Sequence, residues 1–364
     1  MGGSGLIPGW KVKRELSRLG QQLRAIPEAV WEPFARRAHD AALDRGFPIT
    51  EGNLQPGPKF ALVLCWQPKG LAGSFFDLLD HLVSSGYTPF VVSNAALVGA
   101  DREALKSRIW RAVERPNFGY DFGGYRDGLR LLRRWRLHPD RLVIMNDSIW
   151  YPLWAGDQTL RHAEATPFDV TGMFLRQRNA TWFLESYFFS IKGAVLDHPD
   201  FLAFWDGLRL TSNKYKVIRQ GERGFGAALQ AAGVSMGPLF PMSAFEKVFS
   251  EYDETELRRV LNYMAAVDPG VAAERDELVA APPAPDWPDK ARAFVKRVLH
   301  KAQPYSAFPV AAASLGYPVL KKSLEPVSAE WRAAFLRAVD EAVLPQPLPS
   351  VLQEARARQG RHSA

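Results

Sequence analysis

Short apolar runs alternate with helical patterns through the middle of the chain. Residues 60–66, 89–94 and 141–147 are almost continuously apolar, which is typical of strands that are buried on both faces of a parallel sheet. Apolar positions at helical spacing follow the first two runs, at 74–85 and 101–114. Strands that alternate with helices predict an α/β fold whose sheet is mostly parallel.

Weaker patterns extend this unit toward residue 250. They predict strands at 169–174 and 185–191 and helices at 126–135, 198–208 and 224–233. In sheets of this class, ligands bind beyond the carboxyl ends of the strands. The loops at 66–74, 94–101 and 146–152 are therefore the first candidates for a site.

Segments of different character flank this unit. Helical spacing predicts two helices over 10–46, and an Ala/Pro-rich stretch after residue 270 indicates a linker or surface segment before predicted helices at 290–302 and 331–343. We therefore expect three parts: an N-terminal helical extension (1–56), an α/β domain (57–250), and a C-terminal helical and Pro-rich extension (251–364) that packs on or near that domain.

Composition narrows the class of protein. The 364 residues include 46 Lys and Arg against 39 Asp and Glu, a net charge of +7 that suits an anionic partner. The single cysteine, Cys65, excludes an internal disulfide and a cysteine-based zinc site. With no signal-peptide pattern and no run of about 18 apolar residues, we expect a cytoplasmic protein. The basic residues are dispersed and no nucleic-acid-binding module is recognisable, so nucleic acid is not an expected partner.

The stretch RPNFGYDFGGYRDGLRLL (115–132) carries the most chemistry. Gly119 and Gly123 allow a tight turn and a close approach of the backbone to a ligand. Asn117 and Asp121 can hydrogen-bond to sugar hydroxyls, and the helix that follows favours an anion at its start. The same residues fit a plain helix-capping turn, and the local pattern leaves both interpretations open.

A second polar cluster ends the strand in LVIMNDSIWYP (142–152), at Asn146, Asp147 and Ser148. A carboxylate flanked by an amide and a hydroxyl can hold a divalent cation or a ribose. Many enzymes that act on nucleotide sugars use two Asp residues at such a place, and this sequence offers one. A polar turn is the alternative interpretation.

Taken together, these blocks resemble the rhamnan synthesis protein F family of bacterial glycosyltransferases. The resemblance covers residues 59–250, with a weaker echo at 304–326. Its blocks are VVSN (91–94), RPNFGYDFGGYRDGL (115–129), MNDSIWYPL (145–153), DVTGMF (169–174), ESYFFSIKGAVL (185–196), FLAFW (201–205), IRQGERGFGAAL (218–229) and LGYPVLKKSLEP (315–326). The sequence departs from the family pattern at Glu185, where the pattern has Gln, and at Pro116, which replaces a charged or polar residue.

The resemblance implies a GT-A-like nucleotide-sugar fold. It also implies transfer of L-rhamnose from a deoxythymidine-diphosphate (dTDP) donor to a polysaccharide or lipid-linked glycan acceptor, with inversion. The residues that it places around the nucleotide sugar are Ser93, Asn94, Asn117, Gly119, Asp121, Phe122, Gly123, Arg126, Asn146, Asp147, Ser148, Ser186 and Tyr187. Asp147 is then the candidate ligand of a divalent cation, Mg²⁺ or Mn²⁺.

Direct inversion needs a base that takes the proton of the acceptor hydroxyl. The candidates are Glu222, Glu185 and Asp169, and we favour Glu222 because it matches a Glu at a helix start in the family. A Glu that only complements the dipole of its helix is the alternative. Arg115 and Arg126 are candidates for neutralising the charge of the diphosphate.

Two further hypotheses concern partners. A catalytically silent homologue that binds glycan or scaffolds a polysaccharide assembly complex is the alternative to an enzyme. The predicted helix at 290–302 is basic and carries an apolar stripe, so it could lie on an anionic membrane surface at the inner face of the cytoplasmic membrane. The other interpretation is that this stripe packs on the rest of the protein.

Overall fold

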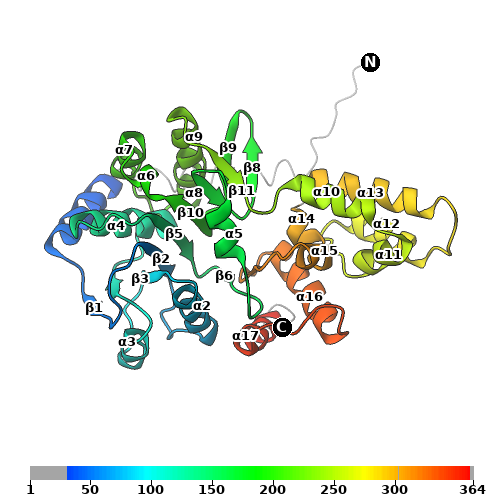
Figure 1. The fold of residues 1–364 in the computed structure, drawn as a ribbon, viewed down its shortest axis with the longest axis horizontal. Coiled ribbons are helices and arrows are strands. Elements are labelled where there is room, and N and C mark those ends of the chain that lie inside the picture. The colour runs from blue at the N-terminus through cyan, green and yellow to red at the C-terminus, as the bar shows by residue number, and fades with distance from the viewer. Residues whose placement is uncertain (1–30, 302, 361–364) are drawn as a thin grey trace, which may run out of the picture.

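The computed structural model describes residues 31–301 and 303–360 (Figure 1). Its centre is an eight-stranded sheet in the order β1-β4-β3-β2-β5-β10-β7-β11. The strands are β1 (Ile49–Glu51), β2 (Lys59–Cys65), β3 (Thr88–Ser93), β4 (Arg111–Glu114), β5 (Arg141–Asn146), β7 (Val170–Gly172), β10 (Phe188–Lys192) and β11 (Met236–Pro238). Two small ladders pair β6 (Ile149–Trp150) with β12 (Leu320–Lys321) and β8 (Leu175–Arg178) with β9 (Thr181–Leu184).

Strand direction decides which residues can meet. The neighbours β4, β3, β2 and β5 are all parallel, so their carboxyl ends lie at one edge of the sheet. Strand β10 is antiparallel to β5, and its first residue, Phe188, pairs with Met145 near the end of β5. The turn that precedes β10 therefore reaches the same edge. The expected α/β fold with a mostly parallel sheet is confirmed, with antiparallel pairs added at β1 and around β10.

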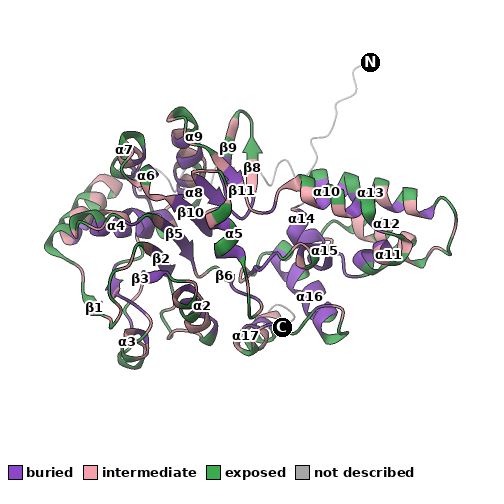
Figure 2. Ribbon diagram, in the orientation of Figure 1, coloured by how far each residue is buried: buried purple, intermediate pink, exposed green. Residues whose placement is uncertain are grey.

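Alternate residues of the strands belong to two separate cores, one on each face of the sheet. Strands β2 and β3 are buried along almost their whole length (Figure 2). On β2, Ala61 and Val63 belong to the first core, and Leu62 and Leu64 to the second. The first is covered by α2 (Gly73–Ser84), α3 (Gly99–Lys106) and α5 (Thr159–Ala165). The second is covered by the helix at 31–45, α4 (Tyr120–Arg134), α7 (Pro199–Gly207), α8 (Lys214–Ile218) and α9 (Gly224–Ala231). The short α6 (Gly193–Leu196) precedes α7, and a π-helical turn, Arg219–Arg223, joins α8 to α9.

Helix α4 packs closely on β2 because it carries glycines where it crosses the strand. A Cβ on Gly124 would lie 2.2 Å from Leu64 Cδ1, and one on Gly128 would lie 2.4 Å from Leu62 Cδ1. At the start of the helix, Gly119 has a φ of +83°, which L side chains rarely adopt. These glycines fix where the first turn of α4 lies.

Gly124→Ala is expected to lower the free energy of unfolding by about 1–3 kcal/mol, because the added methyl group overpacks against Leu64. Helix propensity alone predicts the opposite sign, by roughly 1 kcal/mol. Gly99→Ala in α3 is the matched control, since its Cβ meets nothing within 4 Å. Urea denaturation measures both, and equal midpoints for the two variants would contradict the packing argument.

A group of C-terminal helices packs against the first core. They are α10 (Met242–Glu251), α11 (Glu254–Asn262), α12 (Pro269–Ala280), α13 (Trp287–Lys301), α14 (Pro304–Ala307), α15 (Pro309–Ser314), α16 (Pro326–Asp340) and α17 (Pro349–Gly360). Glu354 on α17 accepts hydrogen bonds from the Ser74 hydroxyl at 2.7 Å and from Trp150 Nε1 at 2.8 Å. These contacts join α17 to α2 and β6, while the division of the chain into three parts with boundaries at 56 and 250 stays a prediction.

Some predicted elements are wrong. The helix expected over 101–114 ends at Lys106, and Arg111–Glu114 forms β4, because Ala112 and Val113 are fully buried in the sheet. The Ala/Pro-rich stretch contains α12, a helix without a buried residue. Of the region 10–46, the part up to residue 30 lies outside the described residues, and 31–45 is helical as predicted.

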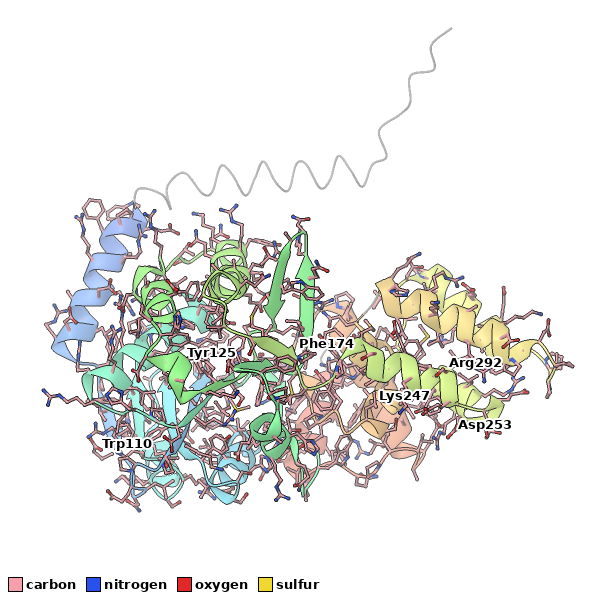
Figure 3. The ribbon with its side chains drawn as sticks, turned by 45° about the horizontal axis from the view of Figure 1, so that its top comes forward. Trp110, Tyr125, Phe174, Lys247, Asp253 and Arg292 are labelled. Atoms are coloured by element: carbon pink, nitrogen blue, oxygen red, sulfur yellow. The ribbon has the colours of Figure 1, made fainter. Side chains whose placement is uncertain are left out.

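Helix α13 does not offer an apolar face to a membrane. Its apolar residues are at most 5% exposed within the first core: Phe294, Val295, Val298 and Leu299. Arg292, on the same helix in Figure 3, donates a hydrogen bond to the carbonyl of Tyr252 at 3.0 Å. The interpretation that this apolar stripe packs on the rest of the protein is confirmed, and the interpretation that it inserts into a membrane is wrong. Within the described ranges, none of the helices combines the length and apolar character needed to span a bilayer.

Candidate functional site

A cleft of about 780 Å³ opens at the carboxyl edge of the parallel strands. Residues from the ends of β2, β3 and β5, from the start of α4 and from the turn before β10 line it together. The predicted site residues that it brings together are Asn94, Asn117, Asp121, Asn146, Asp147, Ser148, Glu185, Ser186, Tyr187 and Glu222. The sheet topology explains why the motifs at the strand ends meet, and Glu222 joins them from the π-helical turn Arg219–Arg223.

Asp147 connects two strand ends. Its Oδ2 atom accepts hydrogen bonds from Trp66 N and Gln67 Nε2, both at 3.0 Å, and its own N–H donates to the carbonyl of Leu64 at 3.0 Å. The next residue, Ser148, donates its hydroxyl to Asn146 Oδ1 at 2.5 Å. Asn146, Asp147 and Ser148 therefore form a hydrogen-bonded floor of the cleft. Trp66, which is 58% exposed, lies beside this floor.

A chain of polar contacts runs from the exposed Asn117 through the buried Asn94 into the protein. Asn94 Nδ2 donates to Asn117 Oδ1 at 3.1 Å, and Arg115 Nη1 donates to Asn94 Oδ1 at 2.5 Å. Arg115 Nε donates in turn to Asp127 Oδ2 at 2.7 Å, and His39 Nε2 lies 2.6 Å from the same oxygen. The helix at 31–45 therefore supports the site from behind.

Asp127→Ala is expected to lower the free energy of unfolding by about 3–5 kcal/mol, because Arg115 and Arg126 lose their shared carboxylate inside the protein. Although burial works to raise the pKa of Asp127, His39 and the two guanidinium groups hold it below its usual range. Its stabilisation is thus present above the unfolded-state pKa and is lost as the pH falls through the folded-state value.

The control for this prediction is Asp206→Ala, which breaks a half-exposed pair with Arg133. That loss is expected to stay within about 1 kcal/mol. Urea denaturation at neutral pH compares the two variants. Equal losses would show that the buried chain behind Asn94 does not support the fold as described.

Two largely buried carboxyl groups, Asp121 and Glu222, lie beside Ser186. The N–H of Ser186 donates to Glu222 Oε1 at 3.1 Å, and the N–H of Phe122 donates to Asp121 Oδ1 at 3.0 Å. Burial raises the pKa of both groups, and the nearby charge of Asp121 raises the pKa of Glu222 further. A carboxylate whose pKa is raised in this way is a stronger proton acceptor than an ordinary glutamate.

Glu185 has the opposite electrostatic environment. The Tyr305 hydroxyl donates to it at 2.7 Å, Arg176 Nη1 donates at 3.0 Å, and Lys321 Nζ lies 3.8 Å away. Burial works to raise the pKa of Glu185, but Lys321, Tyr305 and Arg176 together hold it below its usual range. A carboxylate that stays ionised and is occupied by three partners is a poor proton acceptor.

The other predicted residues do not line the cleft: Ser93, Gly119, Phe122, Gly123, Arg126 and Asp169. The hydroxyl of Ser93 donates to the carbonyl of Ala95, and the ring of Phe122 stacks on Trp205. Arg126 is 2% exposed and ion-paired with Asp127 and Asp40, so it is not available to a diphosphate. Arg115 is likewise buried behind Asn94. The two glycines shape the turn that presents Asn117 and Asp121.

Asp169 lies at the opposite edge of the sheet. It precedes β7, which runs in the same direction as β5, and it pairs with Lys192 at the far end of β10. Its Oδ2 atom accepts a hydrogen bond from the Ser235 hydroxyl at 2.6 Å. Asp169 is therefore not in a position to act as a base in this cleft.

The sequence-based prediction missed one wall of the cleft. The β8–β9 hairpin contributes Arg176 and Arg178, and the segment around β12 and α16 contributes Lys321, Ser323 and Trp331. The weak echo at 315–326 was a signal for the second group. Nothing in the sequence pointed to the hairpin.

The residues present do not fit a metal held by the protein. Among the described residues, no group of three His, Cys, Asp or Glu side chains is placed to hold an ion. Asp147 is a lone carboxylate with one oxygen taken by Trp66 and Gln67, and the buried ammonium of Lys322 already interacts with it. We therefore derive no step through a metal.

Residues 90–257 match the family described as rhamnan synthesis protein F. The uncharacterized protein y4gN of Sinorhizobium fredii (strain NBRC 101917 / NGR234) is 33% identical over 257 residues, which cover 70% of this chain and 67% of that protein.

Two solved structures resemble the chain at low identity. The mannosyltransferase PcManGT from Pyrobaculum calidifontis, in complex with GDP-Man and Mn²⁺, is 14% identical with a TM-score of 0.31, covering 93% of this chain and 94% of its own. TarS 1–349 of S. aureus, in complex with UDP-GlcNAc, is 12% identical with a TM-score of 0.32, covering 84% and 89%. The family match and the relative agree with the sequence blocks, and the chain belongs to the rhamnan synthesis protein F family.

Proposed function

We propose that this protein is a glycosyltransferase that moves a sugar from a nucleoside-diphosphate donor to a hydroxyl group of a polysaccharide or lipid-linked glycan, with inversion. Membership of a family named for rhamnan synthesis supports L-rhamnose as the sugar and dTDP as its carrier. The single observation that carries the proposal is Glu222, a largely buried carboxyl group with a raised pKa, in a cleft at the carboxyl edge of the sheet.

In the proposed reaction, the Glu222 carboxylate takes the proton of the acceptor hydroxyl. The acceptor oxygen attacks the anomeric carbon, and the bond from that carbon to the diphosphate oxygen breaks. The nucleoside diphosphate leaves with the bonding electrons, so one bond forms and one breaks on opposite faces of the sugar. Because the base and the leaving group must lie on opposite faces of the sugar, the diphosphate is expected across the anomeric carbon from Glu222.

Three features of the cleft support a nucleotide as the carrier of the sugar. The amides of Asn94 and Asn117 are held in fixed orientations, and the exposed ring of Trp66 offers a face for stacking. Tyr120, which also lines the cleft, has a φ of +52°, a strained conformation for a residue other than glycine. Such strain is typical of sites that hold a ligand in one pose.

A titration series tests this assignment. Purified protein is titrated with dTDP-L-rhamnose and other nucleoside-diphosphate sugars, with an oligosaccharide of rhamnose, and with duplex DNA. Saturable binding of a nucleotide sugar at micromolar to millimolar concentration is the expected result. Binding of the oligosaccharide without any nucleotide sugar would instead support a silent glycan-binding homologue. Preferential binding of DNA would overturn the proposal.

A further inference from the structure

Two cations from distant parts of the chain converge on one buried carboxylate at the cleft wall. Arg176 lies on the β8–β9 hairpin, and Lys321 lies on β12, next to the C-terminal helices. Both line the cleft, and both contact Glu185, with Arg176 Nη1 at 3.0 Å and Lys321 Nζ at 3.8 Å. Glu185 itself is only 7% exposed.

The charges at this point do not cancel. The single carboxylate of Glu185 faces two cations. The hydroxyl of Tyr305, which lies 2.7 Å from both Glu185 oxygens, takes up further hydrogen-bonding capacity of this carboxylate. The separation of Lys321 from Glu185 is longer than a hydrogen bond, so its ammonium keeps donors for a ligand. Arg176 likewise uses one N–H group on Glu185 and presents a planar fork of five. The pair therefore carries a net positive charge toward the cleft.

A neighbouring cation adds to this charge. Arg223 lines the same cleft, directly after Glu222, and its Nε is buried with no hydrogen-bond partner among the described residues. A buried donor without a partner destabilises the protein, and a ligand that accepts a hydrogen bond from it offsets that cost. The ligand suited to these groups is an anion with several acceptor oxygens.

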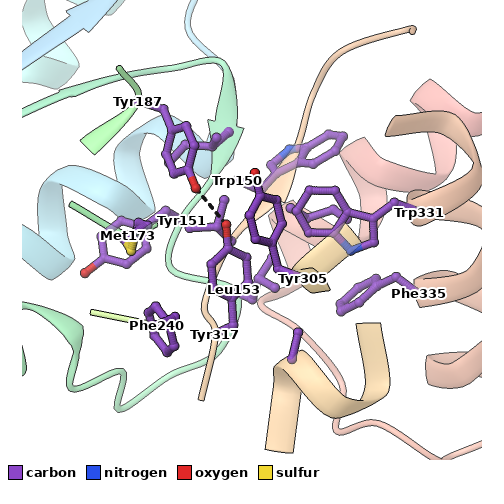
Figure 4. Close-up of a cluster of buried hydrophobic side chains, with 14 of the residues drawn as sticks. Trp150, Tyr151, Leu153, Met173, Tyr187, Phe240, Tyr305, Tyr317, Trp331 and Phe335 are labelled. Carbon is purple, nitrogen blue, oxygen red and sulfur yellow. Dashed lines mark hydrogen bonds between the residues drawn. The ribbon is translucent and has the colours of Figure 1, made fainter. Parts of the chain in front are cut away.

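The position of Lys321 depends on an aromatic wall between the sheet and the C-terminal helices. Tyr187 and Tyr317 share a hydrogen bond of 2.8 Å between their hydroxyls, and Tyr305 stacks on Tyr317 at 4.9 Å between ring centroids (Figure 4). Lys321 Nζ lies 5.0 Å from the ring centre of Tyr187. Since Tyr305 also binds Glu185, this wall and the cation pair form one unit.

We infer that Arg176 and Lys321, held by Glu185, bind the diphosphate of the donor and neutralise it as it leaves, in place of a metal held by the protein. This rests on the proposed function, and it assigns charge stabilisation of the leaving group to two side chains for which the family resemblance gave no role. Preorganised cations aimed at developing charge are the usual means of such stabilisation. Glu185 is a positioning residue in this arrangement.

The test is calorimetric binding of dTDP in the presence of EDTA. The wild-type protein is expected to keep its affinity for dTDP when the chelator is present. Arg176→Gln and Lys321→Gln are each expected to weaken it by about 10- to 100-fold, the scale of a hydrogen bond to a charged group. Lys247→Gln is the matched control, because this lysine is an exposed side chain on α10, away from the cleft (Figure 3).

Thymidine separates a loss of charge from a loss of fold. Its affinity, measured by competition, is expected to stay unchanged in both cation variants and in Glu185→Gln, while that of dTDP falls in all three. A parallel loss of thymidine and dTDP would mean general damage to the cleft and would overturn the inference.

Three other outcomes are decisive. Affinity for dTDP that disappears in EDTA and returns with Mn²⁺, with no effect of the two cation variants, would overturn the inference and leave the proposed function intact. If Arg176→Gln and Lys321→Gln weaken the binding of farnesyl diphosphate but not that of dTDP, the two cations bind a lipid-linked acceptor. That result would overturn the donor assignment. A wild-type protein that binds none of dTDP, UDP and GDP would contradict the proposed function itself.

Discussion

Glu222→Gln is expected to lower kcat by about 100-fold or more while the affinity for the donor stays nearly constant. The amide keeps the shape of the side chain and can still accept the hydrogen bond from the N–H of Ser186, but it cannot take a proton. Steady-state kinetics together with direct donor binding measure the two effects separately. Asp169→Asn is the matched control, because that carboxylate lies at the far edge of the sheet and is expected to leave kcat unchanged.

The pH profile adds a second readout for Glu222. Its raised pKa places the acidic limb of kcat at a higher pH than an ordinary glutamate would give, since protonation removes the base as the pH falls. In Glu222→Gln this limb is expected to disappear from the residual activity. An active Glu222→Gln enzyme, or one that keeps the limb, would show that another group is the base.

Asp147→Ala is expected to lower kcat/KM by about 100-fold, the usual scale for the loss of one group that supports a transition state. The change removes the only carboxylate at the end of β5 and releases Trp66 N and Gln67 Nε2 from the strand end. It also leaves the buried ammonium of Lys322 without this neighbour. Assays with and without EDTA should give the same fold-loss, because no metal step depends on this residue in our account.

Asp147→Asn distinguishes charge from hydrogen bonding. The amide oxygen can still accept from Trp66 and Gln67, so the thermal midpoint is expected to stay close to that of the wild type. If the negative charge of Asp147 acts on the donor, Asp147→Asn should lower kcat/KM as much as Asp147→Ala does. Unchanged turnover in both variants would remove Asp147 from the site.

The fold could be predicted from the sequence where burial dictates the pattern. The strands β2, β3 and β5 appear as continuous apolar runs because both faces of each strand are covered. Strand β4 could not be recognised, because WRAVE continues a helical spacing and only its sheet neighbours make it a strand. Helical spacing did predict α13 and α16, but it could not give their packing partners, which are remote in sequence.

Some residues of the candidate site could be predicted from the sequence and others could not. Asn94, Asn117 and Asp147 follow strands or precede a helix, and parallel strands bring such ends together. Asp169 was misplaced because the sequence does not give the direction of β10, and with it the edge at which β7 begins. Arg176 could not be found from the sequence. It meets Glu185 only because the β8–β9 hairpin folds back, and the other partner of Glu185, Tyr305, is remote in sequence.

The most direct test of the account is a transfer assay with a panel of nucleoside-diphosphate sugars and a rhamnose-containing acceptor, read as release of the nucleoside diphosphate. We expect turnover with one donor, dTDP-L-rhamnose first among them, a product of inverted anomeric configuration, and loss of turnover in Glu222→Gln. A product that retains the donor's configuration, or no turnover and no donor binding across the panel, would contradict the assignment of this cleft to an inverting sugar transfer.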